Sequence, residues 1–399
     1  MRVLAPSQTH ALRIGAPAPE YRPPVREPVA RGRRARRIAL LASSICLIPV
    51  LVSYLGALTE ASNSSIGIRT VEWLRDNGAR GLVNEVESIY YSLNGPSTGG
   101  PALRALPKQA GIASLRPVLA HGLAVRDYRP WRVRPVISPW LPGEGVWHPT
   151  FAAGGSRPPV LVTSFRPDPN YAQLVAGVAW IDAGRTSTWL YPGRLEPGVS
   201  LPSRGPMEVP VRLRSRLVAT FNSGFKLSDS GGGFAEGGHT YAPLKPGLAT
   251  FVRYQGGRID IIPWSGGTDV GPDVVYARQN LPLIVNHGRL NPNLSDGPEW
   301  GATLGNRIRV WRSAVGVDRR GNLIYAAANY QTVGSLAEIV RRAGAVRAME
   351  LDINTYWTSF VSYRYPGAGQ PANLLASMDR PSSRYLTPDD RDFFAVYQK

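Results

Sequence analysis

The sequence has almost no cysteine. Its single cysteine, Cys46, lies inside a long apolar run, so one chain cannot form an internal disulfide. This excludes a small secreted scaffold stabilised by disulfides, and it leaves no cysteine nucleophile outside that run. Apolar residues make up 43% of the 399 residues, so the sequence predicts a large hydrophobic core instead.

Several catalytic signatures are also absent. The sequence has no Gly-x-Ser-x-Gly elbow, and its glycine-rich stretch at 231–238 lacks the Gly-Lys-Ser/Thr of a P-loop. His239 and His287 show neither His-x-His nor His-Glu-x-x-His spacing, which argues against a zinc site. We also find no internal repeat.

Lysine is scarce, yet the chain is strongly basic. Only four of the 46 basic residues are lysines, and the formal net charge is +18. Residues 1–37 carry +7, so the remainder carries +11. A domain with this excess is attracted to anionic wall polymers or to a membrane surface. Nucleic acid is the competing partner, but no nucleic-acid-binding motif accompanies the charge, and we expect none to bind.

One apolar run is long enough to cross a bilayer. Residues 38–58 contain no charge, and at about 1.5 Å per residue they span about 30 Å. Arginines 31, 33, 34, 36 and 37 precede the run, which places the N-terminus in the cytoplasm and the C-terminal domain outside it. The alternative is a cleaved signal peptide, but the leader is long and no small-x-small cleavage site follows. We therefore expect a single-pass protein of the cell membrane.

The remaining chain divides by composition. Pro-, Ala- and Arg-rich residues at the N-terminus predict a disordered tail, and helical spacing after the apolar run predicts a short helical segment broken at Gly78 and Gly81. Many short apolar runs separated by turn residues then predict a β-rich domain. The expected parts are a basic cytoplasmic tail at 1–37, a transmembrane helix at 38–58, a helical stalk at 59–94, a Pro/Gly-rich linker with extended segments at 95–150 and the main domain at 151–399.

One helix within the main domain has clear boundaries. Ser335 and Glu338 have the spacing of a capping box, and Gly344 follows where a C-terminal glycine is expected. A strand is expected directly afterwards, over 346–354. The predicted fold class is therefore α+β, with mixed or antiparallel sheets packed around one or more helices.

The expected strand carries acidic residues on alternate positions. Glu350, Asp352 and Asn354 would share one face, with neighbours about 6.6–6.8 Å apart. Such a spacing suits a pair of carboxylates acting on a glycosidic bond. It also suits oxygen ligands for a divalent cation. The alternative is an ordinary strand with a polar outer face.

Two further stretches are candidates for substrate contacts. Asn222-Ser223-Gly224-Phe225 ends an apolar run in a turn, and Arg312 precedes another apolar strand. An arginine there could bind a phosphodiester through two parallel hydrogen bonds. The competing interpretations are a turn asparagine and a surface arginine.

Taken together, these blocks resemble the phosphodiester glycosidase domain family, whose uncovering enzyme removes N-acetylglucosamine from a sugar phosphodiester. Asn222-Ser223-Gly224-Phe225 resembles the family's Asn-Gly-Gly-Phe-Phe, and Arg312-Ser313-Ala314-Val315-Gly316 resembles its Arg-x-Ala-hydrophobic-Gly. The helix Leu336-Ala337-Glu338-Ile339 and then Ala348-Met349-Glu350-Leu351-Asp352 follow in the family's order over residues 155–365. The anchor makes the chain similar to an actinobacterial, membrane-anchored branch.

The resemblance implies an envelope hydrolase of sugar-1-phosphodiester or related glycosidic bonds, with no obligatory cofactor. It implies Asp352 as nucleophile or general base, Glu350 as the partner acid and Arg312 as the phosphate ligand. The candidate substrate-binding residues are Asn222, Gly224, His239, Asn354, Tyr356 and Trp357.

The chain departs from the family at one point. Ile353-Asn354-Thr355-Tyr356 replaces the family's Gly-Gly-Gly-Ser after the aspartate, so the side chains of Tyr356 and Trp357 would fill that space or stack on a sugar ring. A second hypothesis is therefore a basic glycan-binding or scaffolding protein that has lost catalysis. A third is a cation-dependent enzyme with Asp352 and Asn354 as ligands.

Overall fold

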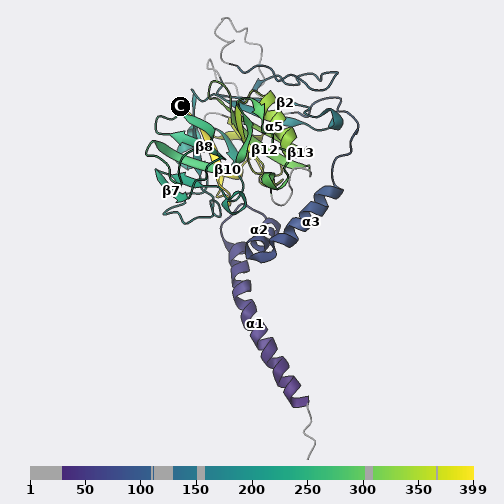
Figure 1. The fold of residues 1–399 in the computed structure, drawn as a ribbon, viewed down its shortest axis with the longest axis vertical. Helices are drawn as coiled ribbons and strands as arrows, with labels where there is room; N and C mark the ends of the chain where they lie inside the picture. The colour runs from purple at the N-terminus through teal and green to yellow at the C-terminus, as the bar shows by residue number, and fades with distance from the viewer. Residues whose placement is uncertain (1–28, 109–110, 112–128, 151–157, 302–308, 365–366) are drawn as a thin grey trace, which may run out of the picture. The chain divides into compact units, whose positions relative to one another are not determined.

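The computed structural model describes residues 29–108, 111, 129–150, 158–301, 309–364 and 367–399. Residues 57–399 form one compact unit (Figure 1), and residues 1–56 are a second unit. The compact unit combines two large antiparallel sheets with few helices, so the predicted α+β class is confirmed. The boundaries expected for the separate domains stay predictions.

The long N-terminal helix α1 spans Val29–Thr59 and contains the apolar run. Its section Gly32–Thr59 is long and apolar enough to cross a membrane, and among the described residues it is the one such helix. Pro49 lies inside the helix, as membrane helices tolerate. The tail expected over 1–37 lies outside the described residues as far as residue 28. Topology and cleavage stay predictions.

Two short helices follow the apolar helix. They are α2 (Ile66–Leu74) and α3 (Arg80–Leu93), joined by the π-turn η1 (Arg75–Ala79). The chain breaks at Gly78, whose φ of 93° is readily adopted only by glycine. The two helices expected on either side of Gly78 and Gly81 are therefore confirmed, with the break at Gly78 and Gly81 inside α3. We call Ile66–Leu93 the helical segment.

Among the described residues the larger sheet has twelve strands, and neighbouring strands run antiparallel. Alternating side chains in its central strands explain the layering, because Ala314 packs toward α5 whereas Val315 and Val317 pack toward the second sheet. Along its main path lie β1 (His148–Pro149), β2 (Val160–Phe165), β3 (Ala176–Ile181), β13 (Leu323–Gln331), β12 (Val310–Val317), β14 (Arg347–Glu350), β10 (Val274–Asn286), β6 (Phe234–Glu236) and β7 (His239–Ala242). Pairing beside β10 are β8 (Leu248–Tyr254), β9 (Ile259–Pro263) and β11 (Arg289–Leu290).

The smaller sheet has five strands and covers the inner face of the larger one. Stacked aromatic side chains fill the space between the sheets; Phe394 of β17 packs on Phe221 of β5 and on Phe251 of β8. In spatial order its strands are β16 (Gly369–Asn373), β15 (Phe360–Arg364), β5 (Leu217–Asn222), β17 (Phe393–Gln398) and β4 (Thr186–Tyr191). Short helical turns complete the unit: α4 (Leu227–Ser230), η3 (Pro169–Tyr171), η4 (Val211–Arg216), η5 (Pro298–Trp300) and η6 (Arg384–Leu386).

Helix α5 (Val333–Arg342) covers the outer face of the larger sheet across β12 and β13 (Figure 1). Its capping box is made by Thr332 and Ser335, so the expected box of Ser335 with Glu338 is wrong. Glu338 lies one turn further on and pairs with Arg341 and Arg342 instead. The expected C-terminal glycine is confirmed, because Gly344 has a φ of 106° directly after the C-cap.

Strand β14 is shorter than predicted and decides where the acidic residues go. It ends at Glu350, and Asp352 and Asn354 lie in the turn that follows. The common face predicted for Glu350, Asp352 and Asn354 is therefore wrong, because extended alternation stops before Asp352. Glu350 faces the core with none of its surface exposed, whereas Asp352 lines a pocket.

Candidate functional site

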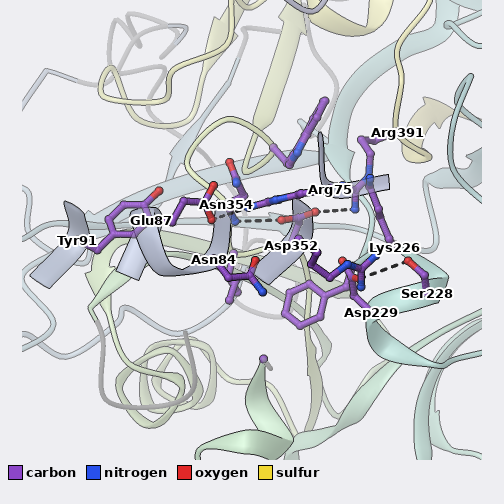
Figure 2. Close-up of a pocket in the computed structure, with 15 residues that line it drawn as sticks. Arg75, Asn84, Glu87, Tyr91, Lys226, Ser228, Asp229, Asp352, Asn354 and Arg391 are labelled. Carbon is purple, nitrogen blue, oxygen red and sulfur yellow. Dashed lines mark hydrogen bonds and ion pairs between the residues drawn. The ribbon is translucent and has the colours of Figure 1, made fainter. Parts of the chain in front are cut away.

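A pocket of about 220 Å³ opens where β14 ends. The turn after β14 supplies Asp352, Asn354 and Trp357, and the helical segment supplies one whole wall (Figure 2). That wall consists of Arg75, Arg80, Asn84, Glu87 and Tyr91. The segment expected as a stalk therefore contacts the β-rich unit and completes its pocket.

Asp352 is the buried carboxylate of this pocket. Its Oδ2 accepts a hydrogen bond from Arg391 at 2.8 Å, and its Oδ1 accepts one from the backbone amide of Asn354 at 3.0 Å. Burial raises the pKa of the Asp352 carboxyl, and the charge of Arg391 and the Asn354 amide oppose that rise. A carboxyl in a cleft whose pKa is shifted by burial and by a specific charged partner is typical of a reacting group.

The backbone of Asp352 is fixed by three neighbours. Its carbonyl accepts hydrogen bonds from Ser313 Oγ at 2.8 Å and from Thr358 Oγ1 at 3.1 Å. Its amide donates to the carbonyl of Ser223 at 3.2 Å. Strand β12 and the turn after β5 therefore hold this carboxylate in one position, as a catalytic group requires.

A buried lysine connects the pocket to the helical segment. Lys226 Nζ lies 2.5 Å from Glu72 Oε2 and 3.1 Å from Asp76 Oδ1. Burial acts to raise the pKa of Glu72, but Lys226 and Arg391 outweigh it and hold that pKa below its ordinary value. Glu72 is thus an ionised carboxylate, and its charge fixes α2 against the turn after β5.

Glu87 is the second carboxylate that lines the pocket. It pairs with Arg75 at 2.5 Å, and both side chains point toward Asp352 and Asn354 (Figure 2). Burial raises the pKa of Glu87, against the charge of Arg75. Glu87 and Asp352 are thus two carboxyls of one pocket, each with a pKa that burial raises and a neighbouring arginine opposes.

The predicted acid and phosphate ligand form a pair inside the core. Arg312 Nη1 donates to Glu350 Oε1 at 2.6 Å, and neither side chain is exposed. Neither residue lines the pocket. Burial, against the charge of Arg312, raises the pKa of Glu350 to about 7. Ser313 links this pair to the site, since it neighbours Arg312 and donates to the Asp352 carbonyl.

Asn222 and Gly224 lie beneath the pocket rather than in it. Asn222 donates to Ser313 Oγ at 3.0 Å and accepts from Tyr325 Oη at 2.9 Å, so its side chain is part of the buried support. Gly224 offers its carbonyl to Arg391 at 3.2 Å, and a Cβ there would approach Asn280 to 3.0 Å.

The other sequence candidates are dispersed. Trp357 lines the pocket with its ring 5.2 Å from Arg391, and Asn354 lines it beside Asp352. Tyr356 turns away, lies under Arg380 and accepts a hydrogen bond from the Ser65 amide. His239 is exposed on β7, where it packs edge-on against Tyr241, and it does not line the pocket.

Six charged pocket residues escaped the sequence prediction: Arg75, Arg80, Glu87, Lys226, Asp229 and Arg391. The spacing of apolar residues predicts the helical segment, but it says nothing about what the polar side chains of that segment contact. Lys226 carried a usable signal, because a lysine is rare in this arginine-rich chain. Arg391 carried none, because it lies 39 residues from Asp352.

The oxygens proposed as cation ligands already accept backbone hydrogen bonds. Asp352 Oδ1 accepts from Asn354, and Asn354 Oδ1 accepts from the Tyr356 amide at 2.9 Å. In the part of the chain that the structure describes, no group of three His, Cys, Asp or Glu residues could hold a metal ion.

Replacing Glu72 with glutamine is expected to loosen the helical segment. The variant loses the charge that Lys226 pairs with, and a charge-assisted hydrogen bond contributes about 1.5–3 kcal/mol. We expect amides of α2 and α3 to exchange with solvent about tenfold faster or more, while amides of β12 and β13 are unchanged. Hydrogen exchange by mass spectrometry measures both. Glu85→Gln, at an exposed position on α3, is the control and should change neither. If amide exchange became equally faster in the two helices and in the two strands, local release of the helical segment would be contradicted.

Comparison with known proteins adds one family match. Residues 216–352 match the family model described as phosphodiester glycosidase, a segment that starts one residue before β5 and ends at Asp352. The resemblance found in the motifs is thereby confirmed for this segment, which is shorter than the 155–365 expected. The branch of the family stays a prediction. No curated protein matches the chain.

Solved structures show only distant likeness. The catalytic domain of zebrafish N-acetylglucosamine-1-phosphodiester alpha-N-acetylglucosaminidase, described as auto-inhibited by its pro-peptide, is 16% identical with a TM-score of 0.41. That match covers 61% of this chain and 85% of the zebrafish chain. A hypothetical protein from Synechocystis is 13% identical with a TM-score of 0.38, covering 60% of this chain and 62% of its own.

Proposed function

We propose that this chain, whose residues 216–352 match a phosphodiester glycosidase model, hydrolyses sugar-1-phosphodiesters or related glycosidic bonds of envelope glycans. The observation that carries the proposal is the position of Asp352. The family match ends at this residue. The same residue is the buried carboxylate just after the end of β14, held by hydrogen bonds from Ser313 and Arg391.

In this proposal Asp352 acts as nucleophile or general base. Arg391 opposes the rise in its pKa that burial causes, and three hydrogen bonds to its backbone hold it in place. Glu87 takes the acid role that the sequence suggested for Glu350, because Glu87 lines the pocket and burial favours its protonated form. Glu350 and Arg312 become positioning residues that support β12 and β14.

To bind a phosphate group, the pocket needs a cationic side chain whose existing ion pair can be broken at low cost. Arg80 lines the pocket and pairs only at the surface with Asp229, where both side chains are more than 40% exposed. Exposed pairs of this kind contribute about 0–1 kcal/mol, so a phosphate can replace Asp229 as the partner of Arg80. Trp357 and Asn354 are then placed to contact the sugar.

The proposal predicts turnover by the full chain in detergent. We expect release of reducing sugar from at least one member of a panel of sugar-1-phosphodiesters and aryl glycosides, measured against a sample without protein. Turnover that persists in a strong chelator would remove the cation-dependent alternative. A folded protein that hydrolyses no panel member would contradict the hydrolase proposal.

A binding protein without catalysis is the second candidate. The observation that favours it is the replacement of the family's glycine run by Ile353-Asn354-Thr355-Tyr356, which adds side chains next to Asp352. Salt-sensitive binding to envelope glycans that survives Asp352→Asn would support this alternative.

A further inference from the structure

A second cavity, of about 590 Å³, lies at the other end of β14. It is bordered by the turn between β12 and β13, by the end of α5 and by residues 129–132. We call this cavity the basic groove. Six arginines line it: Arg129, Arg132, Arg319, Arg320, Arg341 and Arg342.

The basic groove has far more positive than negative charge. Among the described lining residues Asp318 is the single carboxylate, and it is engaged by Trp180 Nε1 and by the Arg320 and Asn322 amides. Glu338 lies behind the groove and pairs with both Arg341 and Arg342. In the described part of the chain, one carboxylate in the lining and one behind it thus accompany six guanidinium groups, so an anion in the groove gains favourable electrostatic energy.

An exposed tryptophan stands at the edge of the basic groove. Trp131 is 94% exposed, although its backbone is fixed because its carbonyl accepts a hydrogen bond from Trp147 at 2.9 Å. The next residue, Arg132, donates to the Glu144 carbonyl at 2.9 Å. A large aromatic ring held in solvent by an ordered backbone suits stacking on a ligand ring.

Guanidinium groups bind phosphates through paired hydrogen bonds, and an aromatic ring packs on the apolar face of a sugar. We propose that the basic groove is a second binding site, which holds a sugar-bearing polymer linked by phosphodiesters. The six arginines contact successive phosphates and Trp131 contacts a sugar of the same polymer.

The position of the groove narrows the substrate class of the pocket. Val346 borders the groove and Asp352 lines the pocket, and strand β14 between them spans about 10 Å at about 3.3 Å per residue. A polymer long enough to bridge this distance can occupy both sites together. This part of the inference rests on the proposed hydrolase function; binding in the groove does not.

Binding is tested with the full chain in detergent and poly(glycerol phosphate) bearing sugar substituents as the probe. Arg319 and Arg320 are exposed on a turn, so Arg319→Ser with Arg320→Ser should preserve the fold. We expect this double variant to bind at least about tenfold more weakly. The slope of log K against log salt should fall in magnitude by about 1.4, at about 0.7 per lost contact. Binding of the probe should quench the fluorescence of Trp131. Trp131→Ala should therefore weaken binding and abolish that part of the quenching.

The matched control removes two exposed arginines elsewhere, through Arg212→Ser with Arg258→Ser. Equal losses in the groove variant and in this control would overturn the proposal. So would groove-dependent binding that is tighter for single-stranded DNA, polyglutamate or phosphatidylglycerol vesicles than for the probe.

The catalytic consequence has a separate readout. If the pocket is active, the double variant Arg319→Ser with Arg320→Ser, here called the groove variant, should have a higher KM for the polymer. Its hydrolysis of a small phosphodiester should be unchanged. Equal KM values for the polymer in wild type and groove variant would overturn the substrate assignment. Absence of all hydrolysis, with groove-dependent binding intact, would contradict the proposed function and leave the binding site supported.

Discussion

Replacing Asp352 with asparagine is expected to lower kcat by about 10²–10⁴-fold on any sugar phosphodiester that the wild-type chain hydrolyses. The amide keeps the size of the side chain and can still accept hydrogen bonds, but it can neither attack a sugar carbon nor accept a proton from water. Because Arg391 loses its charged partner, a modest fall in thermal stability should accompany the change. Initial rates and a melting curve measure both effects.

Asp229→Asn is the matched control for this experiment. It makes the same chemical change at the mouth of the same pocket, where the carboxylate pairs with Arg80 and is 41% exposed. We expect its kcat to stay within a few fold of wild type. If Asp352→Asn kept the wild-type kcat, or lost no more activity than Asp229→Asn, Asp352 would have no role in the chemistry.

Replacing Arg312 with methionine is expected to lower the free energy of unfolding by about 3–5 kcal/mol. The change leaves the Glu350 carboxylate in the core without its charged partner, and Glu350 Oε2 already lacks a hydrogen-bond partner among the described residues. Denaturant unfolding measures the loss. The double variant Arg312→Met with Glu350→Leu should be more stable than Arg312→Met alone, because both charges are removed together. A double variant as unstable as the sum of the single changes would contradict this account.

The same pair predicts a pH dependence of stability. Burial raises the Glu350 pKa from 4.5 to about 7, so between these values the folded state binds a proton that the unfolded chain does not. Stability therefore rises as pH falls from about 7 toward 4.5, and this contribution is lost as pH rises through 7. Unfolding of wild type minus that of Glu350→Gln isolates the effect. A difference that is independent of pH over this range would contradict it.

Local sequence patterns were enough for the fold class and for the helix boundaries that depend on neighbouring residues. Gly344 ends α5 because a positive φ is inexpensive for glycine, and a run of 21 uncharged residues has the length of a bilayer core wherever the chain folds. The ordered motif blocks likewise led to Asp352, the one predicted catalytic residue that lines the pocket.

The composition of the site was decided by tertiary structure. The two-residue alternation of a strand predicted Glu350 and Asp352 on one face. Because β14 ends at Glu350, the Glu350 carboxyl faces the core with Arg312, whereas the Asp352 carboxyl faces the pocket with Arg391. Strand β5 ends at Asn222 and pairs with β17, which begins two residues after Arg391. No local sequence pattern encodes such a contact.

The wall of the pocket shows the same limit most clearly. The sequence alone determined that the segment after the apolar run is helical, because apolar spacing at three and four residues fixes which side chains share a face. It did not determine what that face would cover. Only the packed chain places Glu72 on Lys226 and Glu87 near Asp352, because ion pairs between groups more than a hundred residues apart depend on how the intervening sheets fold.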